Sequence, residues 1–330
     1  MHLSIIVPVF NRPKELKDLL DSLIYQTDPD FEVVIVEDGS TLTSERVVAE
    51  FQSQLDIKYL FIQNAGPGPA RNAGGNVATG DYFVFLDSDC VLPEQYIETV
   101  RRALTLDYAD AFGGPDLARD DFTLLQRAIS YSMTSFLTTG GIRGGSEKLD
   151  KFHPRSFNMG FSREVFACTG GFSAMRFGED IDMSIRIIGN EYATRLIREA
   201  YVYHRRRTNL RRFFKQVYNS GIARINLYMR HPRSLKIVHL APAVFTLGVV
   251  FILLLSLSIS PHFLLLLLLH STVILLDATV RTRNVRTGLL AIVASYVQLL
   301  GYGMGFIHAF FARVLLKKRE FSAFQWSFYK

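Results

Sequence analysis

Four short runs of β-branched, leucine and aromatic residues, each followed by a turn, dominate the first 90 residues of the chain. The runs are Leu3–Phe10, Phe31–Val36, Ile57–Ile62 and Tyr82–Leu86. Short apolar runs bounded by turns are typical of strands that are buried on both faces, as in a parallel sheet. Segments such as Lys14–Tyr25, with leucines at helical spacing, lie between the runs. Strands that alternate with helices form right-handed βαβ units, so the sequence predicts an α/β fold with a mostly parallel sheet.

Two carboxylates follow the run Tyr82–Leu86 at positions i and i+2, namely Asp87 and Asp89. Successive side chains of a strand point to opposite faces, so these two carboxylates are expected to project the same way where the strand ends. Open α/β folds bind their ligands at the carboxyl edge of the sheet. Hard oxygen ligands suit a divalent cation that also takes water and phosphate oxygens. Asp-Ser-Asp is also ordinary turn chemistry, so a surface turn is the alternative.

Polar or glycine-rich segments also follow the other runs. Glu37–Ser40 follows the second run, and the loop Asn64–Pro69 follows the third and leads toward Arg71. Because the carboxyl ends of parallel strands meet at one edge, we expect Asp38, this loop and the two aspartates to line a single rim that fits a nucleotide. Glu37–Ser40 alone would equally form a tight turn. The segment Gly66–Asn72 lacks the dinucleotide fingerprint and the lysine of a phosphate-binding loop, which argues against a dehydrogenase or an ATPase.

Taken in order, these motifs resemble those of the family 2 glycosyltransferases, which have a GT-A fold. The resemblance covers about residues 1–205 and rests on Val7-Pro8-Val9-Phe10-Asn11, Glu37-Asp38-Gly39-Ser40, Gly68-Pro69-Ala70-Arg71-Asn72, Asp87-Ser88-Asp89 and Gly178-Glu179-Asp180. The ordered set is far more specific than any one of its motifs. It implies a Rossmann-like, mostly parallel GT-A sheet and a hexosyltransferase-type enzyme of class EC 2.4.

The resemblance also implies roles for individual residues. The nucleotide of the donor would contact Pro8, Val9, Phe10, Asn11, Glu37, Asp38, Arg71, Asn72 and Ser88. Asp87 and Asp89 would hold Mn²⁺ or Mg²⁺ on the donor diphosphate. His204, on the strand-like segment Tyr201–His204, is a further candidate ligand because imidazole suits Mn²⁺, although it could equally end a strand without a function. Arg205–Arg207 would neutralise the departing phosphates.

Asp180 is the candidate catalytic base. Displacing a nucleoside diphosphate from a sugar carbon by an acceptor hydroxyl needs a base on the face opposite the leaving group, and a carboxylate at a helix start can be aimed there. Glu179 is the fallback for this role, and Asp182 is expected to be structural. The spacing also permits the alternative that these acids only cap the helix and complement its dipole.

A basic amphipathic helix is predicted over Asn209–Arg230, with apolar residues on one face and Arg211, Arg212 and Lys215 largely off it. Such a helix suits the membrane interface, and an ordinary helix packed on the catalytic domain is the alternative. Processive polysaccharide synthases of the family carry Gln-x-x-Arg-Trp near this position. This chain has Gln216-Val217-Tyr218-Asn219 instead, so transfer of a single sugar is expected.

Three long apolar segments follow, over Ile237–Ser260, Phe263–Val280 and Gly288–Leu316. Each is long enough, or nearly so, to cross a membrane. Arginines after the second segment are expected to be cytoplasmic by the positive-inside rule, which agrees with two crossings before them. A third crossing would put Lys317–Arg319 outside, against the same rule, so the third segment either spans, is re-entrant or is bent at Gly301–Gly305.

The predicted domains are a catalytic domain over 1–208, an interfacial helix and linker over 209–236, and a membrane domain with two to three transmembrane helices over 237–330. Much of the net charge of +6 comes from basic residues just before the first apolar segment, which favours lipid headgroups over nucleic acid. Cys90 and Cys168 lack disulfide or metal spacing, and the apolar start of the chain is too short for a signal peptide. We therefore expect a multi-pass protein of the inner membrane with a cytoplasmic catalytic domain.

Together these features predict a membrane-anchored, metal-dependent, inverting glycosyltransferase. It would transfer one sugar from a UDP- or GDP-linked donor to a hydroxyl of a lipid or lipid-linked glycan, in the synthesis of a glycolipid or a cell-surface polysaccharide. A polyprenyl-phosphate glycosyltransferase, whose acceptor phosphate needs little general base, is an alternative with the same fold. A non-catalytic, nucleotide-binding membrane scaffold and a nucleotidyltransferase, which releases pyrophosphate, are alternatives from other classes.

Overall fold

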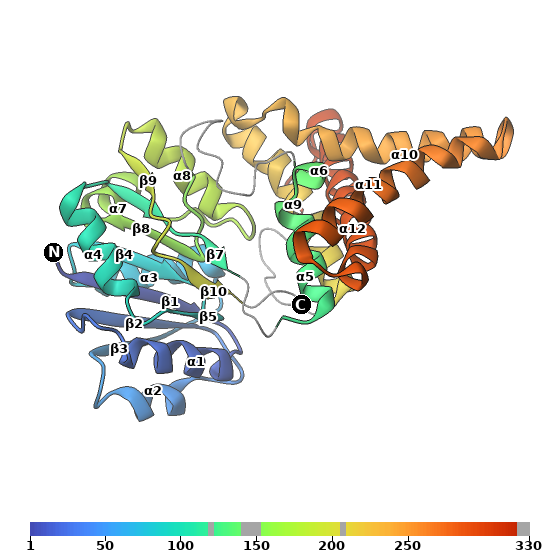
Figure 1. Ribbon diagram of the computed structural model, residues 1–330. Helices are drawn as coiled ribbons and strands as arrows, with labels where there is room; N and C mark the ends of the chain where they lie inside the picture. Colours follow the sequence, from blue (N-terminus) through green and yellow to red (C-terminus); the bar gives the residue numbers. More distant parts are fainter. Residues whose placement is uncertain (118–121, 140–152, 205–208, 322–330) are drawn as a thin grey trace. The chain divides into compact units, whose positions relative to one another are not determined.

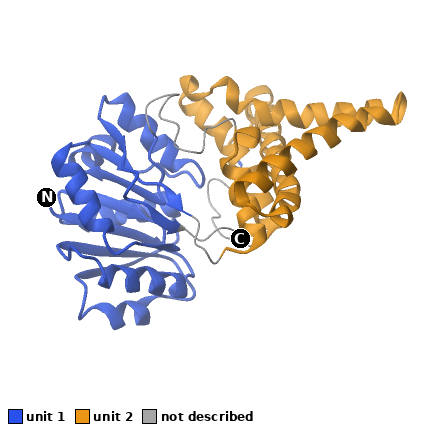
Figure 2. Ribbon diagram, viewed as in Figure 1, with its two compact units in different colours: residues 1–117, 149–205, 321–330 blue, residues 118–148, 206–320 orange. Residues whose placement is uncertain are grey.

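The structure is a computed structural model that describes residues 1–117, 122–139, 153–204 and 209–321. The chain divides into two compact units (Figure 2), each described by itself below. Unit 1 contains residues 1–117, 149–205 and 321–330, and unit 2 contains residues 118–148 and 206–320. Residues 118–148 thus belong to unit 2, although they lie within the predicted catalytic domain over 1–208.

The main sheet of unit 1 has seven strands in the order β3-β2-β1-β4-β8-β6-β9 (Figure 1). Its strands are β1 (Leu3–Val9), β2 (Phe31–Asp38), β3 (Ile57–Ile62), β4 (Tyr82–Leu86), β6 (Ala111–Gly113), β8 (Asn158–Ser162) and β9 (Thr194–Leu196). The first four strands are mutually parallel, and β8 runs antiparallel between β4 and β6. The predicted α/β fold with a mostly parallel sheet is confirmed.

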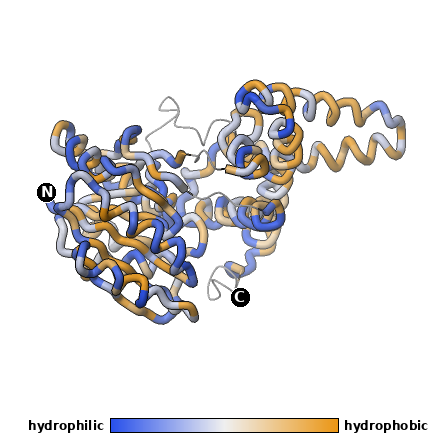
Figure 3. Tube along the Cα trace, turned by 60° about the horizontal axis from the view of Figure 1, so that its bottom comes forward, coloured by the Kyte–Doolittle hydropathy of each residue, from blue (hydrophilic) through white to orange (hydrophobic). Residues whose placement is uncertain are grey.

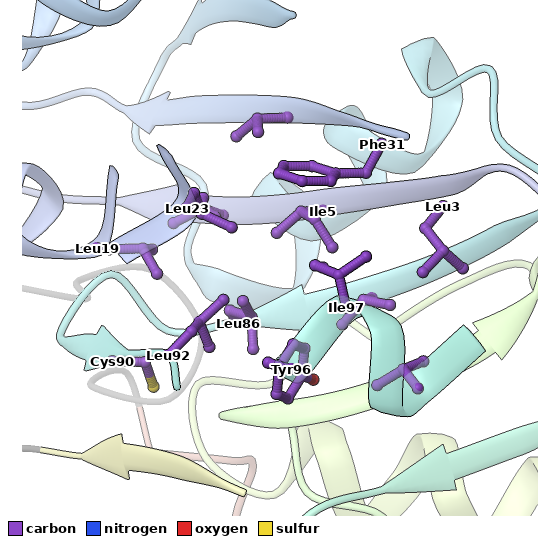
Figure 4. Close-up of a cluster of buried hydrophobic side chains, with 14 of the residues drawn as sticks. Leu3, Ile5, Leu19, Leu23, Phe31, Leu86, Cys90, Leu92, Tyr96 and Ile97 are labelled. Atoms are coloured by element: carbon purple, nitrogen blue, oxygen red, sulfur yellow. The ribbon is translucent and has the colours of Figure 1, made fainter. Parts of the chain in front are cut away.

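Helices cover both faces of this sheet because the strands are apolar on both sides. One face packs on α1 (Pro13–Ile24), α2 (Glu45–Phe51) and α4 (Tyr96–Leu106), and Figure 4 shows part of this cluster. The other face packs on α3 (Pro67–Val77), α7 (Arg163–Thr169) and α8 (Glu179–Gly189). Within β1, Ile5 belongs to the first cluster and Ile6 to the second, as the alternation of side chains along a strand requires.

A second sheet of three short strands has the order β5-β10-β7. These strands are β5 (Cys90–Val91), β10 (Val202–His204) and β7 (Asp116–Leu117). β5 begins directly after Asp89, so this small sheet holds the segment that follows the two predicted metal ligands. In its register the backbone of His204 pairs with that of Cys90.

Glu32, on the buried strand β2, is a charged group inside unit 1. Burial alone would raise the pKa of its carboxyl, but hydrogen bonds from Lys58, Ser4 and Thr79 lower it to about 2. An unfolded glutamate has a pKa of about 4.3. The stabilisation from this group is therefore complete above pH 4.3 and is lost as the pH falls toward 2.

We expect Glu32→Gln to lower the free energy of unfolding at pH 7 by up to about 3 kcal/mol, because it removes the charge that Lys58 and the buried donors hold. Thermal and urea unfolding of the detergent-solubilised protein would measure this, and the difference from wild type should shrink between about pH 5 and pH 2. Glu50→Gln is a control, since this exposed carboxylate pairs only at the surface with Lys17 and should matter by less than about 1 kcal/mol. An equal effect of the two variants would contradict the prediction.

Unit 2 is helical throughout the part of the chain that the structure describes. Its helices are α5 (Leu124–Thr134), α6 (Phe136–Thr139), α9 (Leu210–Arg230), α10 (Ala241–Ser258), α11 (Leu264–Thr282) and α12 (Val285–Ala309), which continues as a π-helix over Phe310–Leu315. Among the described residues, three helical segments are long and apolar enough to cross a membrane: Ala241–Ser258, Pro261–Thr282 and Val285–Leu315. α10 and α11 form a hairpin that is hydrophobic along most of its length (Figure 3).

α12 passes through Gly301, Gly303 and Gly305 as one continuous helix, so these glycines do not interrupt it. The glycines provide room for neighbouring helices instead. A Cβ added to Gly305 would lie 2.0 Å from the carbonyl oxygen of Tyr218 on α9, and one added to Gly303 would lie 2.3 Å from that of Pro242 on α10. Small residues thus allow two helices to approach the backbone of α12 closely.

Candidate functional site

The carboxyl ends of three neighbouring strands of unit 1 carry most of the predicted site residues. β1 lies between β2 and β4, and its last residue Val9 is in register with Glu37 at the end of β2. Pro8 and Val9 end β1, and the carboxylates Asp87 and Asp89 follow β4 on the other side. The ends of β2, β1 and β4 therefore form one rim in that order, as the sequence predicted for ligand-binding segments.

The loops after β1 and β2 are tied together by Asn11, which has a positive φ of 53°. The backbone N–H of Asn11 donates to the hydroxyl of Ser40 at 2.8 Å, and its side-chain oxygen accepts from the backbone N–H of Leu42 at 2.8 Å. Ser40 in turn donates to the buried carboxylate of Glu37, which also accepts from the backbone N–H of Ser44 at 2.8 Å. Asn11 and Glu37 thus fix the shape of this part of the rim.

Asp38 connects the end of β2 to the loop before α3. Its carboxylate accepts hydrogen bonds from the backbone N–H groups of Ala65 and Gly66, at 2.7 and 2.9 Å. Burial raises the pKa of Asp38 above its usual range, although these two hydrogen bonds act in the opposite direction. Gly39 has a φ of 69°, and a Cβ there would lie 2.5 Å from the backbone nitrogen of Asn64. The loop that leads into α3 is therefore held closely against β2.

Arg71, on α3, joins two acidic motifs that lie far apart in the sequence. Its side chain is only 3% exposed and donates to Asp87 at 2.8 Å and to Glu179 at 3.0 Å. Its guanidinium lies over the ring of Phe172, 5.3 Å from the centroid, and its buried Nε has no hydrogen-bond partner among the described residues. The segment after β4 and the start of α8 consequently face the same guanidinium.

Two further arginines complete an alternating arrangement of charges. Arg12 pairs with Asp89, and Arg155 donates to Asp180 at 2.6 Å. The site thus brings together four carboxylates and three guanidiniums, which are Asp87, Asp89, Glu179, Asp180, Arg12, Arg71 and Arg155. The sequence motifs indicated neither Arg12 nor Arg155 as a site residue. Arg12 could have been found from its position shortly after a strand end, whereas no local pattern marks Arg155.

The two acids at the start of α8 have different proton affinities. Burial, followed by the charge of the adjacent Asp180, raises the pKa of Glu179 to about 7. Asp180 is equally enclosed, but the Arg155 guanidinium and the backbone N–H of Ile181, which donates at 2.8 Å, lower its pKa below the usual range. Asp180 is therefore the more acidic of the two groups, and Glu179 holds its proton more strongly than an exposed glutamate does.

The donor set after β4 fits a divalent cation. Asp87 and Asp89 supply hard carboxylate oxygens at the rim, and Mg²⁺ in proteins is commonly held by one or two carboxylates together with water and substrate phosphates. Among the described residues no group of three or more His, Cys, Asp or Glu side chains is placed to hold a metal. The backbone of His204 pairs with Cys90, next to Asp89, while Arg205–Arg207 lie outside the described residues.

The remaining predicted residues have varied surroundings. The side-chain amide of Asn72 exchanges two hydrogen bonds with the backbone of Phe172, at 2.7 and 2.8 Å. Ser88 is buried between the two metal-ligand candidates, and Phe10 is partly buried beyond β1. Asp182 pairs with Arg186 one turn along α8, in keeping with the structural role expected for it.

The model of the family described as Glycosyl transferase family 2 matches residues 4–176, more than half of the chain. Among curated proteins, Glycosyltransferase GlyA of Streptococcus pneumoniae is 41% identical over 110 residues, which are 33% of this chain and 16% of that protein. An uncharacterized glycosyltransferase of Haemophilus influenzae is 30% identical over 195 residues, which are 56% of this chain and 62% of the relative. The chain therefore spans less than two thirds of the length of either relative.

Among solved structures, the chain is similar to the mannosyltransferase PcManGT from Pyrobaculum calidifontis in complex with GDP-Man and Mn²⁺. The TM-score is 0.63 at 18% sequence identity, over 89% of this chain and 86% of the other. At this level of identity the similarity shows a shared fold.

Proposed function

Because the chain belongs to Glycosyl transferase family 2, as the sequence motifs indicated, we propose that it transfers a single sugar from a nucleotide-sugar to an acceptor hydroxyl, with inversion at the sugar carbon. The observation that carries this proposal is the double contact of Arg71. It brings the predicted metal ligand Asp87 and the acidic start of α8 around one guanidinium. Transfer of a sugar from a donor diphosphate to an acceptor hydroxyl requires a metal ligand and a base in the same site.

On the donor side, Asp87 and Asp89 would hold Mn²⁺ or Mg²⁺. Such a cation offsets the negative charge that develops on a departing nucleoside diphosphate. The presence of GDP-Man and Mn²⁺ in a protein of the same fold supports a GDP- or UDP-linked donor and a divalent cation for this chain as well. His204 remains a proposed further ligand on the strength of its backbone position beside Cys90.

The nucleotide would lie along the rim formed by Pro8, Val9, Phe10 and the neighbouring loops. In this proposal Asn11, Glu37 and Asn72 act by shaping those loops, since their side chains already hold backbone groups. Arg71 and Arg12 supply positive charge next to the two aspartates, and Ser88 lies between them.

On the acceptor side, Asp180 is the proposed base. Its ionised carboxylate can take the proton of the acceptor hydroxyl as the bond to the sugar carbon forms. Arg155 and the backbone N–H of Ile181 orient it. Glu179 stays the fallback, because a carboxyl with a pKa near 7 could also accept a proton at neutral pH.

We further propose a lipid or a lipid-linked glycan as the acceptor. Three helical segments of suitable length and composition support association with a membrane, where such acceptors are found. The same helices support a membrane location, and we propose a cytoplasmic catalytic unit because Arg281, Arg283 and Arg286 lie at the end of the second helix or just after it, in line with the positive-inside rule.

Removal of divalent cations should reduce transfer at least a hundred-fold. The detergent-solubilised protein would first be screened for stabilisation by nucleotide-sugars, and transfer or hydrolysis of the best donor would then be measured after treatment with a chelator. We expect added Mn²⁺ or Mg²⁺ to restore the rate, because the diphosphate charge is again offset. Chelator saturated before addition with the same cation that restores the rate is the control for effects of the chelator itself. A rate that is unchanged after chelation would refute the metal requirement.

A further inference from the structure

The first turns of α9 carry a cluster of positive charges. Over Leu210–Arg230 the helix has five arginine or lysine residues and no acidic residue. Arg211, Arg212 and Lys215 are exposed, and with the described residues none of these three side chains forms an ion pair. Lys215 follows the two arginines by four and three residues, so all three side chains share one side of the helix. They line a surface pocket of about 530 Å³, the basic pocket.

An apolar groove adjoins the basic pocket. It has a volume of about 350 Å³ and is lined by residues of α12 between Ile292 and Met304 and by Phe214 of α9. Among the described side chains that line it, the polar atom is the hydroxyl of Tyr296, which already donates to the carbonyl oxygen of Leu267 on α11 at 3.2 Å. A groove whose polar group is already engaged favours an apolar ligand.

Phe214 belongs to both the groove and the basic pocket. A Cβ added to Gly301 would lie 3.3 Å from its ring, so Phe214 lies at the end of the groove formed by Leu300 and Met304. From Ile292 to Met304 the helix advances by about 18 Å. The groove and the pocket therefore form one continuous surface on unit 2, which is apolar along its length and positively charged at one end.

This combination fits an amphiphile with an anionic headgroup. Uncompensated cations beside apolar surface are costly and are stabilised by an anion, and both arginine and lysine bind phosphate oxygens. A length of about 18 Å is more than half of the roughly 30 Å hydrocarbon core of a bilayer, so the groove suits a long chain. The groove belongs to the segment Val285–Leu315, which is apolar enough to cross a membrane, so a chain can enter it directly from lipid.

We propose that this surface binds a lipid in which one long apolar chain ends in a phosphate or diphosphate. The chain lies along α12 in the groove, and the phosphate contacts Arg211, Arg212 and Lys215. A single groove accommodates one chain, which distinguishes this ligand from a phospholipid with two acyl chains.

This inference rests on the proposed function and narrows its acceptor to a glycan that is attached through phosphate to such a chain. Only four residues separate Asn209, at the start of α9, from the end of strand β10. The phosphate is therefore held at the end of α9 where the chain arrives from unit 1.

Thermal unfolding of the full-length protein in a neutral detergent tests the site without donor or transfer. Hexadecyl phosphate is the probe, and a chelator keeps divalent cations away from the candidate catalytic site. We expect this lipid to raise the Tm by at least about 3 °C. Hexadecanol and inorganic phosphate, each at the same concentration, should shift the Tm by less than about 1 °C, because each offers only one part of the ligand.

Two double variants of α9 test the role of the basic pocket. Arg212→Gln/Lys215→Gln should abolish the shift, because it removes two of the three cations that face the phosphate. Arg224→Gln/Arg230→Gln removes the same charge further along α9, outside the basic pocket, and should retain the shift.

A second pair of variants tests the groove. Val293 is exposed and lines the groove, so Val293→Trp should fill it and abolish the shift without disturbing the buried core. Leu289 is also exposed on α12 but does not line the groove, and Leu289→Trp should retain the shift. Val293→Phe would serve if the tryptophan variant failed to fold.

An equal shift with hexadecanol, or an undiminished shift in either Arg212→Gln/Lys215→Gln or Val293→Trp, would overturn the proposal. An equal shift with phosphatidylglycerol in place of hexadecyl phosphate would indicate a general contact with anionic phospholipid and would overturn it as well. Because neither donor nor turnover enters the measurement, a failure of the proposed transferase activity would be distinguished from a failure of this site.

Discussion

Replacing Asp180 with asparagine is expected to lower the rate of sugar transfer about a thousand-fold while the affinity for the donor stays within about threefold of wild type. The substitution keeps the size of the side chain and an oxygen that Arg155 can contact, but removes the charge that accepts the proton. Single-turnover transfer from the best donor would measure the rate. Isothermal titration with the matching nucleoside diphosphate would measure binding.

Glu179→Gln is the matched variant for this experiment because it neutralises the adjacent acid. If Asp180 is the base, Glu179→Gln should retain much more activity than Asp180→Asn. If Glu179 were the base instead, its variant would suffer the larger loss, and the wild-type rate would rise with pH around a midpoint near 7, where its pKa lies. A rate close to wild type for Asp180→Asn would favour a phosphate acceptor, which needs little general base.

The second large effect is expected for Asp89→Asn, which should reduce transfer by about a thousand-fold and weaken donor binding in the presence of Mn²⁺. The variant removes one of the two proposed carboxylate ligands of the cation. It also removes the carboxylate that pairs with Arg12, so the protein would no longer hold the cation and this guanidinium in place for the diphosphate. Transfer and Mn²⁺-dependent thermal stabilisation by nucleoside diphosphate would be measured together.

Asp107→Asn is the control for Asp89→Asn, because Asp107 pairs with Arg195 through a side chain that is 72% exposed. It removes the same charge without touching the candidate site and should leave both measurements unchanged. Full activity of Asp89→Asn, or an equal loss in the two variants, would contradict the metal role of Asp89.

The proposed donor side of the site could be predicted from the sequence, because the positions of strands along the chain and the residues that follow them are local properties. Alternating strands and helices predicted a parallel sheet, and a parallel sheet brings its carboxyl ends to one edge. That edge contains Asp38, Asp87 and Asp89, and Arg71 comes from the helix after the third strand. The motifs in order then pointed to the family.

Other features depend on long-range packing, which a local pattern does not encode. The pairing of Arg155 with Asp180 joins two segments 25 residues apart in sequence, and neither segment indicates it. Glu37 follows a strand in the same way as Asp87, yet its carboxylate holds the backbone of its own loop. Likewise, the apolar face of α5 packs on α12 in unit 2, a contact that the local pattern of α5 does not show.

The buried guanidinium of Arg71 links the electrostatics of the two sides of the site. Without a donor, its charge is shared between Asp87 and Glu179. Once Asp87 is engaged by the donor complex, more of that charge would act on Glu179 and favour its ionised form. Binding of the donor would thereby favour loss of the Glu179 proton and leave both carboxylates at the start of α8 ionised. Arg71 would in this way favour binding of the donor before the acceptor.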